Sequence, residues 1–182
     1  MASSLASACG GDPPDKEMQQ AQSAIDRARV SGADEYARDE ITAADEALKR
    51  SRDAVAQRDY RLALNNALDS RERAQTAEKD AAGKKAIART DAERLVAAAT
   101  AALSQSRASL KTAERARPRG RTLPNARRSI AAADLAVQKA GAAFRQDKYR
   151  DAEKALDGVI ARLTAVTRDL NAAAGAAPRR RR

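Results

Sequence analysis

The chain has 182 residues and a formal net charge of +10, and 43% of its residues are hydrophobic. Alanine supplies 47 of these residues, so large aliphatic side chains are scarce and we expect a thin helical core rather than a compact globule. The absence of histidine and the single cysteine exclude histidine-based catalysis, an intramolecular disulfide and a cysteine zinc site. Catalysis by carboxylates or lysine stays open, but the composition favours a non-enzymatic protein without cofactor or metal.

Residues 1–14 resemble the end of a bacterial lipoprotein signal followed by a polar linker. Small residues precede Cys9, and Gly10-Gly-Asp-Pro-Pro follows it. In such proteins the cysteine is lipidated, so Cys9 is the predicted lipid anchor. Eight residues are too few for a basic region and an apolar region, so we expect the true start to lie upstream of Met1. The alternative is that Cys9 is an ordinary thiol on a frayed cytosolic terminus.

Residues 15–85 predict a first helical unit. Asp15 is the expected N-cap of its first helix, which ends near Gly32. The second helix carries an apolar seam of alternating large and small residues, which suits an antiparallel partner. The seam consists of Ala37, Ile41, Ala44, Leu48, Ser51 and Val55. The pattern is interrupted at residues 58–60 without glycine or proline, so a turn there stays open.

A third apolar pattern begins at Tyr60 and continues to Arg117. One long helix fits it because no proline intervenes, although Thr90 could cap a new helix. The prolines at 118 and 124 end it. Residues 86–177 form the second predicted unit, with helices at 124–146 and 148–174, and residues 178–182 form a basic tail. The last helix carries the most regular heptad: Leu156, Val159, Leu163, Val166 and Leu170.

Residues 41–63 return, 89 positions later, as residues 130–152. The copies share ten identical positions: Ile41/Ile130, Ala43/Ala132, Ala44/Ala133, Asp45/Asp134, Ala47/Ala136, Ala54/Ala143, Gln57/Gln146, Tyr60/Tyr149, Arg61/Arg150 and Ala63/Ala152. The repeat predicts a duplicated helical hairpin in which Tyr60 and Tyr149 are structural corner residues. The sequence therefore predicts an all-α protein, an elongated antiparallel bundle of two related three-helix or hairpin units with alanine-rich seams and disordered termini.

The remaining functional signal is an excess of basic residues in the second half of the chain. Residues 91–182 contain 20 Lys and Arg against 9 Asp and Glu, whereas residues 1–90 contain 15 against 16. The candidate residues for an anionic partner are Arg115, Arg117, Arg119, Arg121, Arg127, Arg128, Arg179, Arg180, Arg181 and Arg182. Their guanidinium groups could neutralise phosphate, but the scarcity of aromatic residues argues against nucleic acid. The alternative is a solvated loop and tail.

Acidic residues do not form a recognisable catalytic pair. Neighbouring acids such as Asp45 and Glu46 point about 100° apart on a helix, so a solvated face is the favoured interpretation. No arrangement typical of a nucleophile with its base, or of a calcium loop, is present in the sequence.

Three segments together resemble a known family, the domain of unknown function 4398. They are Ala33-Asp-Glu-Tyr-Ala-Arg-Asp-Glu-Ile41, Ala44-Asp-Glu-Ala-Leu48 and Gln57-Arg-Asp-Tyr-Arg-Leu-Ala63. The resemblance covers about residues 9–85, with a diverged second copy behind it. It implies a cell-envelope lipoprotein of a Gram-negative bacterium and supplies no activity. Some members carry a peptidoglycan-binding domain that this chain lacks.

Two functional hypotheses follow from the sequence. The first is a non-enzymatic lipoprotein, anchored in a membrane through Cys9 and facing the periplasm, which acts as a spacer or interaction scaffold for an anionic envelope component or a protein partner. The second is a cytosolic basic helical protein that binds nucleic acid or another anionic partner. The sequence leaves a homo-oligomer open in both cases.

Overall fold

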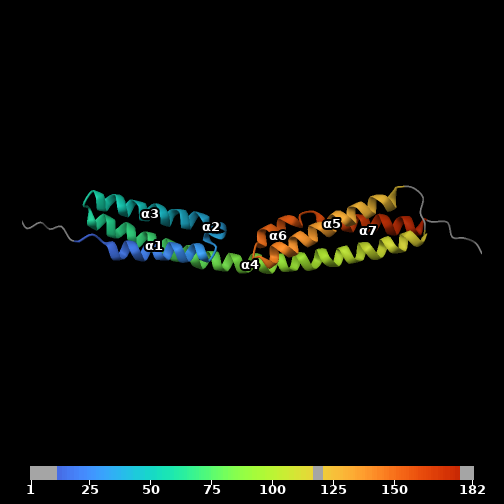
Figure 1. Cartoon of the computed structure of the whole chain (residues 1–182), viewed down its shortest axis with the longest axis horizontal. Helices are drawn as coiled ribbons and strands as arrows, with labels where there is room; N and C mark the ends of the chain where they lie inside the picture. Colours follow the sequence, from blue (N-terminus) through green and yellow to red (C-terminus); the bar gives the residue numbers. More distant parts are fainter. Residues whose placement is uncertain (1–11, 117–120, 177–182) are drawn as a thin grey trace, which may run out of the picture. The chain divides into compact units, whose positions relative to one another are not determined.

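The computed structural model describes residues 12–116 and 121–176, which form seven α-helices and no strand (Figure 1). The chain divides into two compact units, unit 1 up to Ala86 and unit 2 from Ile87 onward. The prediction of an all-α protein is confirmed for the described residues. Of the predicted leader and linker only residues 12–14 are described, and the basic tail at 178–182 lies outside the described residues.

Unit 1 consists of two helices, a short connecting helix and the first part of a long helix. These are α1 (Asp15–Val30), α3 (Arg38–Ala56), α2 (Ala33–Tyr36) and α4 (Tyr60–Ala116). The predicted N-cap of α1 is wrong by one residue, because Pro14 holds that position and Asp15 is the first helical residue. The predicted end is confirmed. Gly32 has a φ of 94°, a left-handed conformation that glycine adopts without steric cost.

Small side chains form most of the core of unit 1. The predicted seam of α3 is confirmed, since Ile41, Ala44 and Leu48 are at most 2% exposed and Val55 is half-buried. On α4 the facing residues are fully buried alanines: Ala63, Ala67, Ala74, Ala77 and Ala81. Alanine leaves little bulk between two helices, so their backbones can approach closely.

Two buried serines show how close α3 and α4 come. The Ser51 hydroxyl on α3 donates to the carbonyl oxygen of Ala63 at 2.7 Å. The Ser70 hydroxyl on α4 donates in the opposite direction, to the carbonyl oxygen of Ala44 at 2.8 Å. Each bond satisfies a hydroxyl that would otherwise be costly to bury. The seam is therefore held by polar contacts as well as by apolar packing.

Helix α4 continues without interruption for 57 residues. Of the two alternatives that the sequence left open, one long helix is thus the correct one as far as Ala116, and Thr90 does not cap a new helix. The helix contributes buried residues to both units, Ala63 to Ala81 in unit 1 and Ala92 to Ala113 in unit 2. It therefore serves as the third main helix of unit 1 and as the first helix of unit 2.

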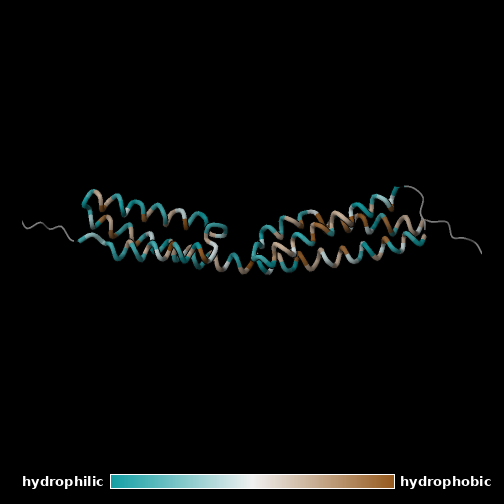
Figure 2. Tube along the Cα trace, in the orientation of Figure 1, coloured by the Kyte–Doolittle hydropathy of each residue, from teal (hydrophilic) through white to brown (hydrophobic). Residues whose placement is uncertain are grey.

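Unit 2 combines the second part of α4 with three helices. These are α5 (Thr122–Arg145), α6 (Tyr149–Ala155) and α7 (Val159–Gly175). Its core is richer in large side chains, including Leu103, Ile130, Leu163 and Leu170. Figure 2 shows this difference as a higher density of hydrophobic residues along the helices of unit 2 than along those of unit 1.

The interruption that the sequence left open is a tight turn, and it is the same in both copies. After α3, the Arg58 N–H donates to Val55 and the Asp59 N–H to Ala54. After α5, the corresponding donors are Asp147 and Lys148, and their acceptors are Phe144 and Ala143. This pair of bonds defines a Schellman motif. The residue in the left-handed region is Arg58 in one copy (φ 59°) and Asp147 in the other (φ 58°), so the usual glycine signal is missing.

The helix predicted from Lys148 to Ala174 is wrong in one respect, because it is divided into α6 and α7. Gly158, with a φ of 65°, lies between them and gives Val159 a new helix start. The heptad still describes the core: Leu156, Val159, Leu163 and Leu170 are at most 2% exposed. The predicted start at Pro124 is also wrong, since α5 begins at Thr122. A proline is tolerated in the first turn because its missing N–H has no partner there.

We expect Asp59→Ala to lower the free energy of unfolding by about 1 kcal/mol. The Asp59 carboxylate accepts a hydrogen bond from the Leu62 N–H at 2.9 Å at the start of α4, and alanine would leave that group without its cap. The matched control is Lys148→Ala, since Lys148 holds the same position before α6 and makes no side-chain cap. Urea denaturation followed by circular dichroism measures both. Equal losses would contradict the capping role.

We expect Ala99→Leu to destabilise unit 2 by about 1–3 kcal/mol, the usual cost of overpacking a core. Ala99 on α4 is fully buried, and a larger side chain would force the helices apart. Ala98→Leu is the control, because Ala98 is exposed on the same helix and leucine is a good helix former. Thermal denaturation of the two variants should separate them. A seam that tolerates leucine at position 99 would rule out close packing as the source of stability.

Candidate functional site

The predicted basic residues that the structure describes are close to the connection from α4 to α5. Arg115 lies in the last turn of α4, where a cation interacts favourably with the helix dipole. Arg121 is the N-cap residue of α5, and Arg127 and Arg128 follow on that helix. All four are exposed. The remaining candidates, Arg117, Arg119 and Arg179 to Arg182, lie outside the described residues, as does Cys9.

Two of these four arginines already have polar partners. The Arg127 guanidinium donates to Oε1 of Glu114 through Nε at 3.0 Å and Nη2 at 2.7 Å. This contact joins α5 to α4. Arg128 donates to Oδ1 of Asn125 at 2.6 Å. Both contacts occupy part of a guanidinium group, but only the Glu114 carboxylate offsets a positive charge, because Asn125 is neutral. Arg115 and Arg121 are the members best placed to meet an anion.

The two corner tyrosines occupy equivalent positions with different burial. Tyr149 is 4% exposed, and its ring contacts Phe144 with the centroids 5.4 Å apart and the planes at 59°. Such a tilted pair is a favourable aromatic geometry. Tyr60 is half-buried at the start of α4, and the residue that corresponds to Phe144 is Val55. The ring therefore fills the corner of unit 2 more completely than that of unit 1.

The Tyr149 hydroxyl also has a charged partner. It donates to Oδ1 of Asp147 at 2.6 Å, and Asp147 is the residue in the left-handed conformation of the turn. This hydrogen bond is the largest cause that raises the pKa of Tyr149 above its ordinary value, followed by burial and by the carboxylate charge; Arg89 acts in the opposite direction. The arrangement stabilises a neutral phenol and ties the turn to the start of α6.

Several acidic residues that could have been catalytic instead pair with arginine. Arg29 on α1 contacts Asp45 on α3 at 2.6 Å and Asp34 on α2 at 3.6 Å. Arg107 on α4 contacts Asp134 on α5 at 2.8 Å. Such partly exposed pairs contribute about 0–1 kcal/mol each, so they orient neighbouring helices more than they stabilise them. Within the described residues no group of three or more acidic or cysteine side chains could hold a metal ion.

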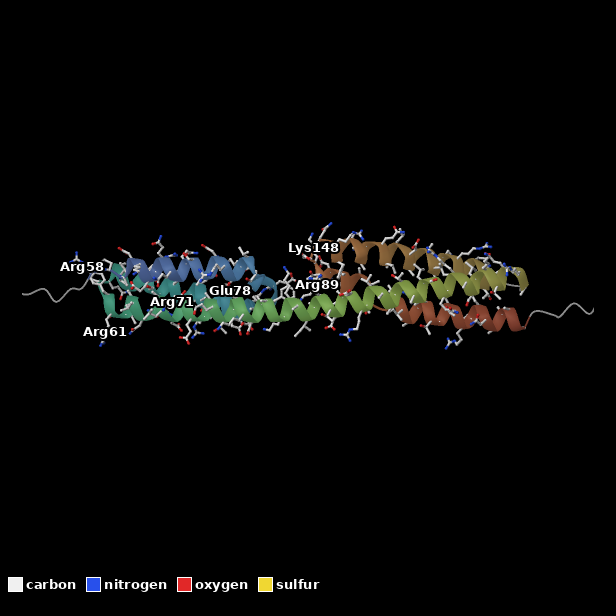
Figure 3. All side chains as sticks on the ribbon, turned by 90° about the horizontal axis from the view of Figure 1, so that it is seen from below. Arg58, Arg61, Arg71, Glu78, Arg89 and Lys148 are labelled. Carbon is white, nitrogen blue, oxygen red and sulfur yellow. The ribbon has the colours of Figure 1, made fainter. Side chains whose placement is uncertain are left out.

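Two polar grooves were not predicted. In unit 1, a groove of about 460 Å³ is lined by Lys16, Gln19, Gln20, Ser23, Arg27 and Arg71. Arg71 donates to Gln20 at 2.7 Å, and Arg27 is 3.7 Å from Glu78, so the two arginines of this groove have polar partners. Arg71 and Glu78 are labelled in Figure 3.

In unit 2, a groove of about 550 Å³ between α5 and α6 contains three lysines. The sequence could have indicated this groove through a comparison of the two copies of the repeat. Lys148 and Lys154 stand where the first copy has Asp59 and Asn65.

The comparison with known families matches residues 16–95 to a domain of unknown function, DUF4398. The matched segment comprises 80 of the 182 residues, less than half of the chain. The match confirms the predicted resemblance and extends from α1 into the part of α4 that enters unit 2. No curated protein and no solved structure matches the chain. Among the described helices, none is long and apolar enough to cross a membrane.

We expect the Tyr149 phenol to ionise at higher pH than an ordinary tyrosine, whose pKa is about 10. Because the folded pKa is raised, the stabilisation is complete below the unfolded pKa and is lost as the pH rises through the folded value. An NMR titration of the tyrosine ring carbons, assigned with Tyr149→Phe, measures it. Asp147→Asn keeps a residue that tolerates the left-handed conformation and should lower the pKa. A Tyr149 phenol that titrates at the pH of an ordinary tyrosine would contradict a raised pKa.

Proposed function

We propose that this protein is a non-enzymatic helical scaffold of the bacterial cell envelope, anchored through a lipidated Cys9 and facing the periplasm. The observation that carries the scaffold role is the continuity of α4, which supplies buried seam residues to both units. Because the two cores are built on one helix, unfolding that helix would disturb both. A spacer or docking protein needs such coupling, whereas it needs no enclosed reaction site.

The envelope location in this proposal is supported by the sequence around Cys9 and by the family match. Cys9 follows a run of small residues and precedes a polar linker, and residues 16–95 match the DUF4398 family, whose resemblance implies an envelope lipoprotein. The first helix, α1, begins six residues after Cys9, at Asp15. A lipid on Cys9 would then hold unit 1 near a membrane surface through a short polar segment, with the outer faces of both units accessible to partners.

The anionic partner in this proposal would meet unit 2. Arg115 and Arg121 are exposed near the connection from α4 to α5, and guanidinium groups bind phosphate or carboxylate oxygens well. The competing function, a cytosolic basic protein with an anionic partner, would use the same residues. The two proposals therefore differ in location and not in the basic surface, and location is what the decisive experiment must measure.

We expect the protein to sediment with membranes when its gene is expressed with the native upstream sequence in a Gram-negative bacterium, and to require detergent for release. Cys9→Ser removes the lipidated thiol and should move the protein to the soluble fraction. Ser7→Ala is the matched control, because it keeps a small residue ahead of Cys9 and should leave the protein in the membrane. A Cys9→Ser protein that stays in the membrane fraction would overturn the anchor, and a soluble wild-type protein would favour the cytosolic alternative.

A further inference from the structure

We propose that the groove between α5 and α6 of unit 2 binds a ligand bearing two or more phosphate groups, through Lys139, Lys148 and Lys154. The groove has a volume of about 550 Å³ and is lined by Lys139, Ala142, Ala143, Gln146, Lys148, Asp151, Lys154 and Ala155. The lining of the groove thus contains three lysines and one acidic residue. Binding in this groove requires neither the lipid anchor nor the envelope location.

The repeat shows that one of these lysines has lost an acidic partner. In unit 1, Arg50 is 3.6 Å from Asp69, which joins α3 to α4. The corresponding pair in unit 2 is Lys139 and Gly158. Gly158 has no side chain and divides α6 from α7. Lys139 therefore keeps the positive charge of its counterpart, while the carboxylate that neutralised it is absent from that position.

Other positions of the groove are also more positively charged than their counterparts in unit 1. Asp59 and Asn65 of unit 1 correspond to Lys148 and Lys154, and Asp53 corresponds to Ala142. Over the eight lining positions the formal charge is −1 in unit 1 and +2 in unit 2. Like charges gathered at one concave place repel one another. A bound anion would offset this repulsion.

Helix stability does not account for Lys148. Its counterpart Asp59 accepts a hydrogen bond from the Leu62 N–H and caps α4, whereas Lys148 makes no side-chain cap before α6. A cation near a helix N-terminus also interacts unfavourably with the helix dipole. Lys148 lies on the surface of unit 2 (Figure 3). The exchange of Asp for Lys at this position therefore reduces local stability, as expected of a residue retained for binding.

The chemistry of the groove favours phosphate over other anions. A lysine ammonium group is a compact charge with three donors and does not require the planar, two-pronged partner that suits arginine. It therefore suits the tetrahedral oxygens of phosphate. The Gln146 amide adds a neutral donor, and the three alanines leave room without blocking the lysines. The volume exceeds that of one phosphate ion, so the groove has room for a ligand with two or more phosphate groups.

The test is a titration of the full chain with sodium tripolyphosphate at low ionic strength, followed by calorimetry and by NMR shifts. The variant Lys139→Gln/Lys148→Gln/Lys154→Gln should bind at least tenfold more weakly. The control, Lys49→Gln/Lys79→Gln/Lys111→Gln, removes the same charge from exposed positions outside the groove and should weaken binding by no more than about threefold, the effect of net charge alone. Equal weakening of both variants would overturn the site.

A second variant keeps the test decisive if the triple variant folds poorly. Lys148→Asn removes one cation and supplies a residue that caps helices well. It should weaken tripolyphosphate binding while the melting temperature stays the same or rises. This combination separates binding from folding, because a lysine with a structural role would lose both. A Lys148→Asn protein that binds as tightly as the wild type would contradict the proposal.

A vesicle experiment distinguishes the two sources of phosphate. Wild type and the triple groove variant are sedimented with vesicles of phosphatidylcholine and cardiolipin, a lipid whose headgroup carries two phosphate groups. If the phosphate comes from a lipid headgroup, wild type sediments and the groove variant does not. If it comes from a soluble compound, tripolyphosphate binds and vesicles do not discriminate between the two proteins. Wild type that binds neither tripolyphosphate nor vesicles would overturn the inference in both forms.

Discussion

Close approach of helix backbones along seams of small residues is the constraint on which the rest of this structure depends. Ser51 and Ser70 reach the backbone carbonyls of the neighbouring helix in unit 1, and Ser106 reaches Leu163 and Thr167 in unit 2. A serine hydroxyl is too short to make these bonds unless the backbones are near one another. Alanine at the other seam positions permits that distance, and it explains why a chain with few large apolar residues can still exclude water from its cores.

The same constraint directs function toward the outer faces of the helices. The buried side chains are mostly alanine, with four serines, a few leucines and isoleucines, one valine and two tyrosines, and none of them carries a formal charge at neutral pH. Charged residues lie outside, where some join helices, as Arg29 and Arg127 do. Others, including Arg115 and the lysines beside α6, line the surface of unit 2. Recognition of an anion by such a surface is compatible with a rigid helical core because it requires no change in the seam.

The two copies of the repeat share a backbone turn but differ in the charged residues beside it. The Schellman turn is preserved in both copies, with the left-handed residue at the same place although its identity differs. Unit 1 then caps the next helix with Asp59, whereas unit 2 places Lys148 there and holds the corner with Tyr149 and Asp147. The backbone geometry was retained while the charge was reversed. Some differences between the copies therefore serve packing, as at Asp147, whereas helix capping does not explain Lys148.

The repeat and the apolar periodicity were sufficient to determine that the chain is helical and which residues occupy the seams. These properties depend on local propensity and on spacing, which a sequence states directly. The absence of proline permitted one continuous α4, but only the structure excluded a new helix start at Thr90. Only the tertiary structure decided that residues 58 and 147 turn the chain without glycine, that Gly158 divides the last helix, that Arg127 pairs with Glu114 and that three lysines share a groove. Those outcomes depend on contacts between residues on different helices, and a one-dimensional pattern does not record which side chains meet across a seam.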